Sequence, residues 1–185
     1  GRTAREPQAV AFHKTDDRSS LDALARRLIA AFRASDLATP NGAILGIEEE
    51  LTGELIPGVP DLLAGIDLLV DVGEALVLTD FKTARSRWSD DQVRDAAGQL
   101  LLYHELATPL ADGRPVRLEF AVLTKAKSPE LVRHTVTPSQ PQIERTKRIV
   151  ERVWAGIEAE LFFPSPSAMN CPGCPFRRSC DAWPK

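Results

Sequence analysis

The 185-residue sequence lacks a long apolar run, and no stretch approaches the roughly eighteen residues that a membrane-spanning helix needs. It also lacks a Gly-x-x-x-x-Gly-Lys phosphate-binding loop, so any helicase activity would have to come from another chain or domain. Cysteine is scarce, with three residues in the whole chain. An odd number of cysteines without a secretion signal argues against a disulfide framework. We therefore expect a soluble, cytoplasmic protein that has no membrane partner.

The composition shows no excess of positive charge, since the formal net charge is -3. Proteins that bind nucleic acids usually carry a net positive charge, so this value argues against such a role at first sight. The cationic residues are nevertheless clustered, and the clusters are Lys82, Arg85 and Arg87; Lys125 and Lys127; Arg145, Lys147, Arg148 and Arg152; and Arg177 and Arg178. The third cluster is equally compatible with an ordinary solvated helix face. By their position, Arg85 and Arg87 are the better candidates for phosphate contacts.

The apolar periodicity predicts a chain of alternating helices and strands in one domain. Helices are predicted over 20–34, capped by Ser19 or Ser20, over 91–107, capped by Asp90 or Asp91, and over 138–161. Strands are predicted over 43–51, 68–70, 75–78, 116–124 and 132–136. With 43% apolar residues, the chain can bury a substantial core without help from a metal. The pattern therefore indicates an α/β fold.

Two carboxylates and a lysine fall at positions that a hairpin would bring together. Asp67 precedes the apolar run at 68–70, residues 71–74 have the composition of a turn, and the next run leads into Asp80. Side chains alternate between the faces of a strand, so we expect Asp80 and Lys82 on one face and Phe81 on the other, toward the core. Magnesium-assisted phosphodiester hydrolysis needs hard oxygen ligands beside the scissile phosphate. The pattern is thus typical of a metal-dependent nuclease.

These segments resemble the PD-(D/E)XK nuclease superfamily, and within it the RecB-like branch that includes helicase-linked and CRISPR-adaptation nucleases. The resemblance covers about residues 44–103 and resumes at the C-terminal cysteines. An Asp-x-Lys alone is more often a surface charge pair, so the order and spacing of the segments carry the likeness. The resemblance implies that Asp67 and Asp80, with the Phe81 carbonyl, hold one or two magnesium or manganese ions. It also implies that Lys82 orients or helps to deprotonate the attacking water and stabilises the charge on the phosphate.

The same resemblance assigns roles to a helix and to an earlier strand. Gln99 and Tyr103 match a Gln-x-x-x-Tyr motif of the family. Because they are four residues apart on a predicted helix, they share a face and could both reach the site or the DNA. Glu48 occupies a place where relatives carry a glutamate that supports the metal, although two further glutamates follow it directly.

One rival alignment and one departure from the family pattern remain. Asp61 follows a proline and could replace Asp67, but we prefer Asp67 because apolar residues flank it, whereas Asp61 lies in an expected turn. The RecB-like branch places a histidine on a helix well before the first aspartate. His13 is the one histidine upstream of Asp67, and its context favours an ordinary exposed residue. His104 and His134 are expected to be surface or packing residues.

All three cysteines lie between positions 171 and 180 in a C-x2-C-x5-C pattern. Thiolates on such a tight loop can ligate a soft metal. The pattern resembles the tail of RecB-like nucleases, which implies that Cys171, Cys174 and Cys180 bind a four-iron, four-sulfur (4Fe-4S) cluster as a structural staple. The fourth cysteine of that tail is missing here, so the last ligand would come from another residue, a partner or a segment lost by truncation. Zinc with three cysteines and a histidine, or three free thiols, are the alternatives.

Together these features predict a restriction-endonuclease-like α/β core with a mixed central sheet flanked by helices and a C-terminal cysteine loop. We expect residues 1–163 to form a nuclease-like domain and residues 164–185 a metal-binding tail packed on it. The expected function is a divalent-metal-dependent DNA nuclease, an exonuclease or end-processing enzyme of repair, recombination or defence. Its expected partners are DNA, single-stranded or with free ends, and a helicase or another nuclease subunit. The alternatives are a catalytically silent nucleic-acid-binding or scaffold module and a small metal-binding interaction domain.

Overall fold

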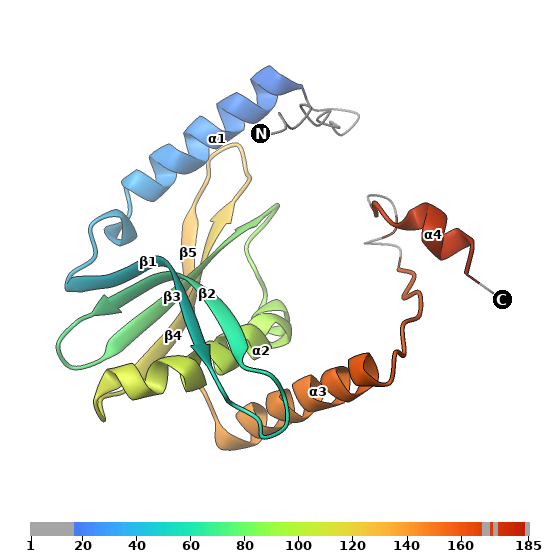
Figure 1. Cartoon of the computed structure of the whole chain (residues 1–185). Helices are drawn as coiled ribbons and strands as arrows, with labels where there is room; N and C mark the ends of the chain where they lie inside the picture. Colours follow the sequence, from blue (N-terminus) through green and yellow to red (C-terminus); the bar gives the residue numbers. More distant parts are fainter. Residues whose placement is uncertain (1–16, 168–170, 172–173, 184–185) are drawn as a thin grey trace, which may run out of the picture.

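The computed structural model describes residues 17–167, 171 and 174–183 (Figure 1). The elements in chain order are α1 (Arg18–Arg33), η1 (Asp36–Ala38), β1 (Ala43–Gly53), β2 (Leu62–Asp71), β3 (Leu76–Ala84), α2 (Asp90–Ala107), η2 (Thr108–Ala111), β4 (Val116–Thr124), β5 (Leu131–Val136), α3 (Gln140–Glu158) and α4 (Arg177–Asp181). The predicted order of helix, three strands, helix, two strands and helix is confirmed.

The five strands form one mixed sheet in the order β1-β2-β3-β4-β5. Strands β3 and β4 are parallel, and the other three neighbouring pairs are antiparallel. A parallel pair needs a crossover connection, and α2 provides it. Strand β4 is buried at every position except Arg117, as expected for a strand covered on both faces. The predicted α/β class with a mixed sheet flanked by helices is confirmed.

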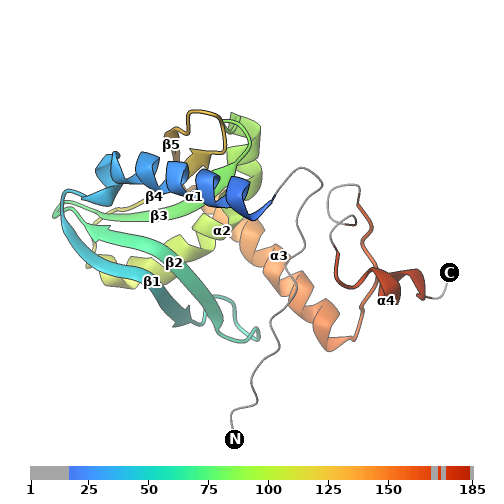
Figure 2. The same ribbon diagram turned by 90° about the horizontal axis from the view of Figure 1, so that it is seen from above.

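Helices cover both faces of the sheet (Figure 2). On one face, α2 and α3 bury Leu100 and Ile143 against strand residues such as Phe120. On the other face, Phe32 of α1 and Leu37 of η1 pack on the sheet. Each strand side chain near the candidate site can therefore be assigned to one face of the sheet by the hydrophobic cluster that it contacts.

Two helix caps differ from the sequence prediction. Helix α1 begins two residues earlier than expected, because the Asp17 side chain accepts a hydrogen bond from the Ser20 backbone N–H at 2.7 Å and Ser20 Oγ accepts one from the Asp17 backbone N–H at 2.9 Å. Helix α2 is capped by Ser89, whose side chain and that of Gln92 form the same reciprocal pair. The predicted caps at Ser19 or Ser20 and at Asp90 or Asp91 are therefore wrong, since a reciprocal pair satisfies two backbone N–H groups where a lone residue satisfies one.

The C-terminal part of the chain extends away from the sheet. Helix α3 packs on α2 with its first half and then projects, and α4 lies beyond its C-terminal end in both views (Figures 1 and 2). In the part of the chain that the structure describes, no helix combines the length and apolarity that crossing a bilayer requires. The division into residues 1–163 and 164–185 stays a prediction.

Candidate active site

Asp67 and Asp80 lie beside each other where β2 and β3 separate. The paired ladder between these strands ends at Leu68 and Thr79, one residue short of the two aspartates, although both strands continue. Beyond that point the Asp67 carboxylate replaces a backbone acceptor, because its Oδ2 accepts a hydrogen bond from the Phe81 N–H at 2.6 Å. The hairpin thus brings the two predicted carboxylates together.

Asp80 and Lys82 face α2, whereas Phe81 faces α1. Phe81 joins the cluster on the α1 face, and its ring meets that of Phe32 edge-on at 5.5 Å. Asp80 is 2% exposed, and its Oδ2 lies 2.6 Å from the Lys82 ammonium. The Lys82 side chain is 30% exposed. The predicted alternation is confirmed, and the lysine links a buried carboxylate to the surface.

The charge on Asp80 is only partly compensated. Burial raises the pKa of the Asp80 carboxyl above its ordinary value of 3.8, Lys82 opposes this rise, and the negative charge of Asp67 adds to it. Within the described part of the chain, Asp80 Oδ2 accepts no well-aligned hydrogen bond, so the Lys82 ammonium contacts it as an ion pair. Burial therefore disfavours the ionised form of Asp80, and Lys82 offsets this effect only in part.

Gln99 and Tyr103 continue this chain of polar contacts onto α2. The Lys82 ammonium donates to Gln99 Oε1 at 3.2 Å, and Gln99 Nε2 donates to the Tyr103 hydroxyl oxygen at 2.5 Å. The two α2 residues are on one helix face, as their spacing predicts. Four of the residues proposed from the sequence, Asp80, Lys82, Gln99 and Tyr103, are thus connected in series.

Glu48 and Asp61 lie at different distances from this centre. Glu48 is exposed and adopts a positive φ of 54° within β1, and its neighbours in the strand pair with Leu68 and Ile66, so its backbone lies next to Asp67. Asp61 is exposed and directly precedes β2. It lies six positions before Asp67 along an extended chain, which corresponds to about 20 Å.

Two aromatic residues at the site were not predicted from the sequence. The Lys82 ammonium lies 6.0 Å from the centre of the Phe120 ring, and Trp88 meets Phe120 edge-on at 5.2 Å. The His134 ring lies 6.5 Å from Trp88, which agrees with the prediction of a packing role for this histidine. Phe120 could have been suspected because β4 was predicted and Phe120 lies opposite Asp80 in its register. The position of Trp88 in a loop gave no such signal.

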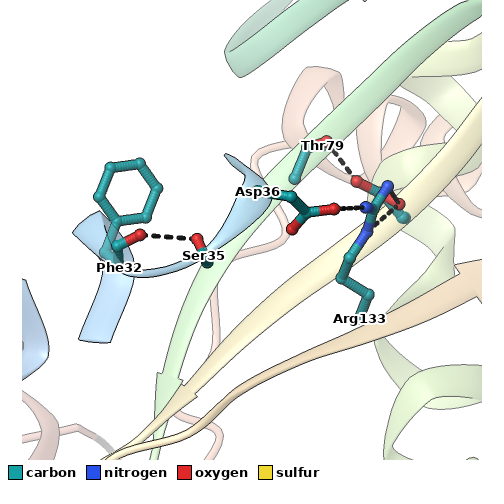
Figure 3. Close-up of polar contacts among 6 residues, drawn as sticks. Phe32, Ser35, Asp36, Thr79 and Arg133 are labelled. Carbon is teal, nitrogen blue, oxygen red and sulfur yellow. Dashed lines mark hydrogen bonds and ion pairs between the residues drawn. The ribbon is translucent and has the colours of Figure 1, made fainter. Parts of the chain in front are cut away.

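A second polar cluster lies on the α1 face of the sheet (Figure 3). Glu119 accepts hydrogen bonds from Thr79 Oγ1 at 2.7 Å and from Arg133 Nε and Nη2 at 2.9 and 2.7 Å. Arg133 Nη1 also donates to Asp36 at 2.7 Å. The Glu119 carboxylate and the Arg133 guanidinium thus have partners at both ends, so this cluster fastens η1 to the sheet instead of offering free groups to a ligand.

Several cationic residues highlighted by the sequence are engaged in ion pairs. Arg87 pairs with Glu130, and Lys147 pairs with Glu105 at 2.5 Å, which ties α3 to α2. The expectation that Arg87 is free for phosphate contacts is therefore not supported. In the described ranges, the residues of those clusters without an ion pair are Arg85, Lys125, Lys127, Arg145, Arg148, Arg152 and Arg178.

The cysteine segment shows local contacts. Cys171, Cys174 and Cys180 are free thiols of intermediate exposure, and Ser167 N–H donates to Cys171 Sγ at 3.2 Å. Over residues 17–167, 171 and 174–183, no group of three or more His, Cys, Asp or Glu side chains is arranged to hold a metal ion. This applies to the thiols and also to the set of Asp67, Asp80 and Glu48. His13 lies outside the described residues.

Comparison with solved structures supports the fold. The chain is similar to a candidate exonuclease from Eubacterium rectale, with a TM-score of 0.58 and 16% identity; the match covers 91% of this chain and 64% of that one. It is also similar to SSO0001, with a TM-score of 0.47 and 17% identity, over 90% of this chain and 72% of that one. The chain thus spans less than two thirds of the Eubacterium rectale protein. The comparison with curated proteins gave no match.

Comparison with protein families finds one family that matches nearly the whole chain. The sequence profile of the PD-(D/E)XK nuclease superfamily matches residues 3–181. This range includes the strands that carry Asp67, Asp80 and Lys82 and the helix that carries Gln99 and Tyr103. The chain belongs to the PD-(D/E)XK nuclease superfamily.

Proposed function

We propose that the protein is a divalent-metal-dependent DNA nuclease of the RecB-like branch, an exonuclease or end-processing enzyme that acts on single strands or free ends. The observation that carries this proposal is the pair of adjacent carboxylates, Asp67 and Asp80, with Lys82 at 2.6 Å from the buried one. The similarity to a candidate exonuclease of Eubacterium rectale makes exonuclease activity the first to test. Repair, recombination and defence are the processes that need such an activity.

The side chains at the site offer the kind of donor atom that a hard divalent cation binds, although the described residues form no ready-made group of three ligands. Asp67 and Asp80 offer carboxylate oxygens, and the Phe81 carbonyl and Glu48 are proposed as further ligands. Magnesium is commonly held by one or two carboxylates together with water and substrate phosphates, so two adjacent aspartates suffice as the protein's main contribution. Burial, with a smaller contribution from the negative charge of Asp67, raises the pKa of Asp80, and a cation bound between the two carboxylates would favour its ionised form. A magnesium or manganese ion bound there would neutralise charge on the scissile phosphate.

Lys82 is proposed to position the water that attacks the phosphate. Its ammonium is held between Asp80 Oδ2 at 2.6 Å and Gln99 Oε1 at 3.2 Å, and part of the side chain reaches the surface. Gln99 is itself held by the Tyr103 hydroxyl. An ammonium held by one hydrogen-bond acceptor and one ion-pair partner still has protons to present to a water molecule or to a phosphate oxygen, where it would stabilise developing negative charge.

The cysteine tail is proposed as a separate structural centre. Cys171, Cys174 and Cys180 would bind a 4Fe-4S cluster, with zinc as the alternative, and would clip the end of the chain without taking part in catalysis. The described residues do not bring three sulfur atoms together, so this proposal rests on the sequence spacing. Anaerobic purification followed by iron, sulfide and zinc analysis and an absorption spectrum would distinguish the two metals, and a protein free of all three would contradict both.

Cleavage of end-labelled DNA tests the main proposal. Single-stranded and duplex substrates labelled at the 5′ or 3′ end would be incubated with magnesium, manganese or EDTA. We expect metal-dependent cleavage that falls by about 100-fold or more in Asp80→Asn and Lys82→Met, since each removes a charged group from the reacting centre. Asp61→Asn is the matched control, because the same change about 20 Å away should leave activity unchanged.

The outcomes separate the candidate functions. The label position reports the polarity of cleavage, and the product ladder distinguishes an exonuclease from an endonuclease. If Asp61→Asn abolishes cleavage while Asp80→Asn does not, the site assignment is wrong. If the folded wild type binds DNA but does not cut any substrate with either metal, the chain is a silent binding module instead.

A further inference from the structure

The projecting half of α3 carries apolar side chains that no part of the described structure covers. Together with the segment that follows it, this half forms a groove of about 680 Å³. Its exposed apolar residues are Ile149 (55% exposed), Val153 (57%), Ile157 (44%), Leu161 (66%) and Phe163 (76%). Three of them recur every four residues on the helix, which makes a continuous apolar stripe. Such a stripe on a helix that leaves the body of a protein is typical of an interaction surface.

One edge of this groove is strongly basic. Arg145, Arg148 and Arg152 line it, and the lining includes no acidic residue. None of these three arginines forms an ion pair with another described residue. The acidic residues of α3, at positions 144, 151 and 158, are spaced by seven and form a stripe that runs beside Arg148, outside the lining of the groove. The lining of the groove thus carries a net positive charge next to its apolar floor.

A glycine lies within this lining. A Cβ added at Gly156 would have nothing within 4 Å, so the position is open toward the groove. Glycine in a helix interior costs about 1 kcal/mol relative to alanine, and nothing in the described structure offsets that cost. A close approach by another backbone is the usual physical reason to leave out a side chain at such a position.

We propose that this groove docks an amphipathic helix with acidic flanks, supplied by a protein partner. The apolar stripe would take the apolar face of that helix, the arginines would pair with its acidic residues, and Gly156 would admit its backbone. The charge disfavours a symmetric contact with a second copy, because such an interface would gather the arginines of both copies without any acidic residue of the lining to pair with them. A nucleic-acid strand is disfavoured because the lining is mainly aliphatic, whereas single strands are held on aromatic side chains.

Two designed helical peptides test this proposal. Both have leucine at i, i+3, i+4 and i+7; one has glutamate at the flanking positions and the other has lysine, and each is labelled for fluorescence anisotropy. We expect the full chain to bind the glutamate peptide at least about tenfold more tightly than the lysine peptide. The double variant Arg148→Glu, Arg152→Glu should reverse that preference. Arg117→Glu, on the opposite face of the molecule, should leave it unchanged.

Substitutions at the glycine separate shape from charge. Gly156→Ala should fold as the wild type does and bind slightly less tightly, because a methyl group intrudes little on the approaching backbone, whereas Gly156→Phe should fold equally well but lose binding by about tenfold or more, because its ring would fill the groove. Circular dichroism would establish that both variants are folded. Because Gly156 is outside the nuclease centre, DNA cleavage should be the same in both, so this test is independent of the proposed nuclease activity.

Several outcomes would overturn the proposal. Equal binding of the two peptides, or a preference that the double arginine variant does not reverse, would remove the acidic helix as the occupant. A concentration-dependent dimer in sedimentation analysis that Ile157→Ser abolishes would assign the groove to a second copy. Displacement of the glutamate peptide by an oligothymidylate or by phosphatidylserine vesicles would assign it to a nucleic acid or a membrane surface.

Discussion

Replacement of Lys82 by methionine should destabilise the protein strongly, because it leaves the Asp80 carboxylate buried without its cation. Removal of one partner from a buried ion pair costs about 3–5 kcal/mol. Asp80 is 2% exposed, but 30% of the Lys82 side chain is exposed, so water can partly solvate the remaining charge. We therefore expect the free energy of unfolding to fall by about 2–3 kcal/mol at pH 7.5, somewhat less than for a fully buried pair.

The complementary substitution should behave differently. Asp80→Asn removes the buried charge and keeps the shape of the side chain, and Lys82 can turn its ammonium toward solvent. We expect its stability to stay within about 1 kcal/mol of the wild type, and the double variant to resemble Asp80→Asn. Urea unfolding monitored by circular dichroism gives the free energy of unfolding of the wild type, the two single variants and the double variant. The double-mutant cycle then isolates the interaction energy of the Asp80–Lys82 pair.

The pH dependence of stability provides a second measurement of the cost of burying the Asp80 carboxylate. Because burial raises the pKa of Asp80 above 3.8, the folded protein holds this proton more tightly than the unfolded chain does. Ionisation of this carboxyl therefore lowers the free energy of unfolding as the pH rises from about 3.8 through the raised pKa. Above the raised pKa the full loss of stability is present. Without Lys82 that penalty grows, so Lys82→Met should lose less stability at acidic pH than at pH 7.5.

An exposed ion pair serves as the control. Arg117 pairs with Glu74, and the two side chains are 55% and 71% exposed, so Arg117→Met should cost no more than about 1 kcal/mol. The reasoning is refuted if Lys82→Met costs as little as this control, or if Asp80→Asn is as destabilising as Lys82→Met at neutral pH.

Three further predictions address the metal, the α1 face and the core. Magnesium should raise the melting temperature of the wild type but not that of Asp80→Asn in a thermal-shift titration; an equal rise in both would place the ion elsewhere. Arg133→Met should cost about 1–3 kcal/mol in urea unfolding because Glu119 is only 8% exposed, whereas Asp36→Asn, at a 70% exposed partner, should cost less than about 1 kcal/mol. Leu100→Ala should cost about 2–5 kcal/mol, because this α2 side chain is fully buried; a smaller loss would mean that the core collapses around the cavity.

Much of the site could be predicted from the sequence because its residues are close together in the chain. A short hairpin fixes which residues face each other, and strand alternation fixes the face, so the juxtaposition of Asp67 with Asp80 and the direction of Phe81 followed from local rules. The same locality makes Gln99 and Tyr103 share a helix face. Their contact with Lys82 could not be derived in this way, because it depends on how α2 crosses the sheet.

Other features could not be predicted from the local pattern. Trp88 and Phe120 meet near Lys82 only because the crossover places β4 beside β3. The positive φ of Glu48 reflects an irregular strand in which three consecutive glutamates gave no means of choosing among them. The helix caps were misplaced because a single favourable residue was considered, whereas a reciprocal pair decides where each helix begins.

The sequence by itself determined the class of fold, the order of its elements and which residues are candidates for the site, because apolar periodicity and turn composition act over a few residues at a time. The tertiary structure decided which charges are paired, how deeply Asp80 is buried, and that Arg87 is held by Glu130 while the arginines of α3 line an open groove. These properties depend on desolvation and on contacts between distant segments. They exist only once the sheet and its helices have come together.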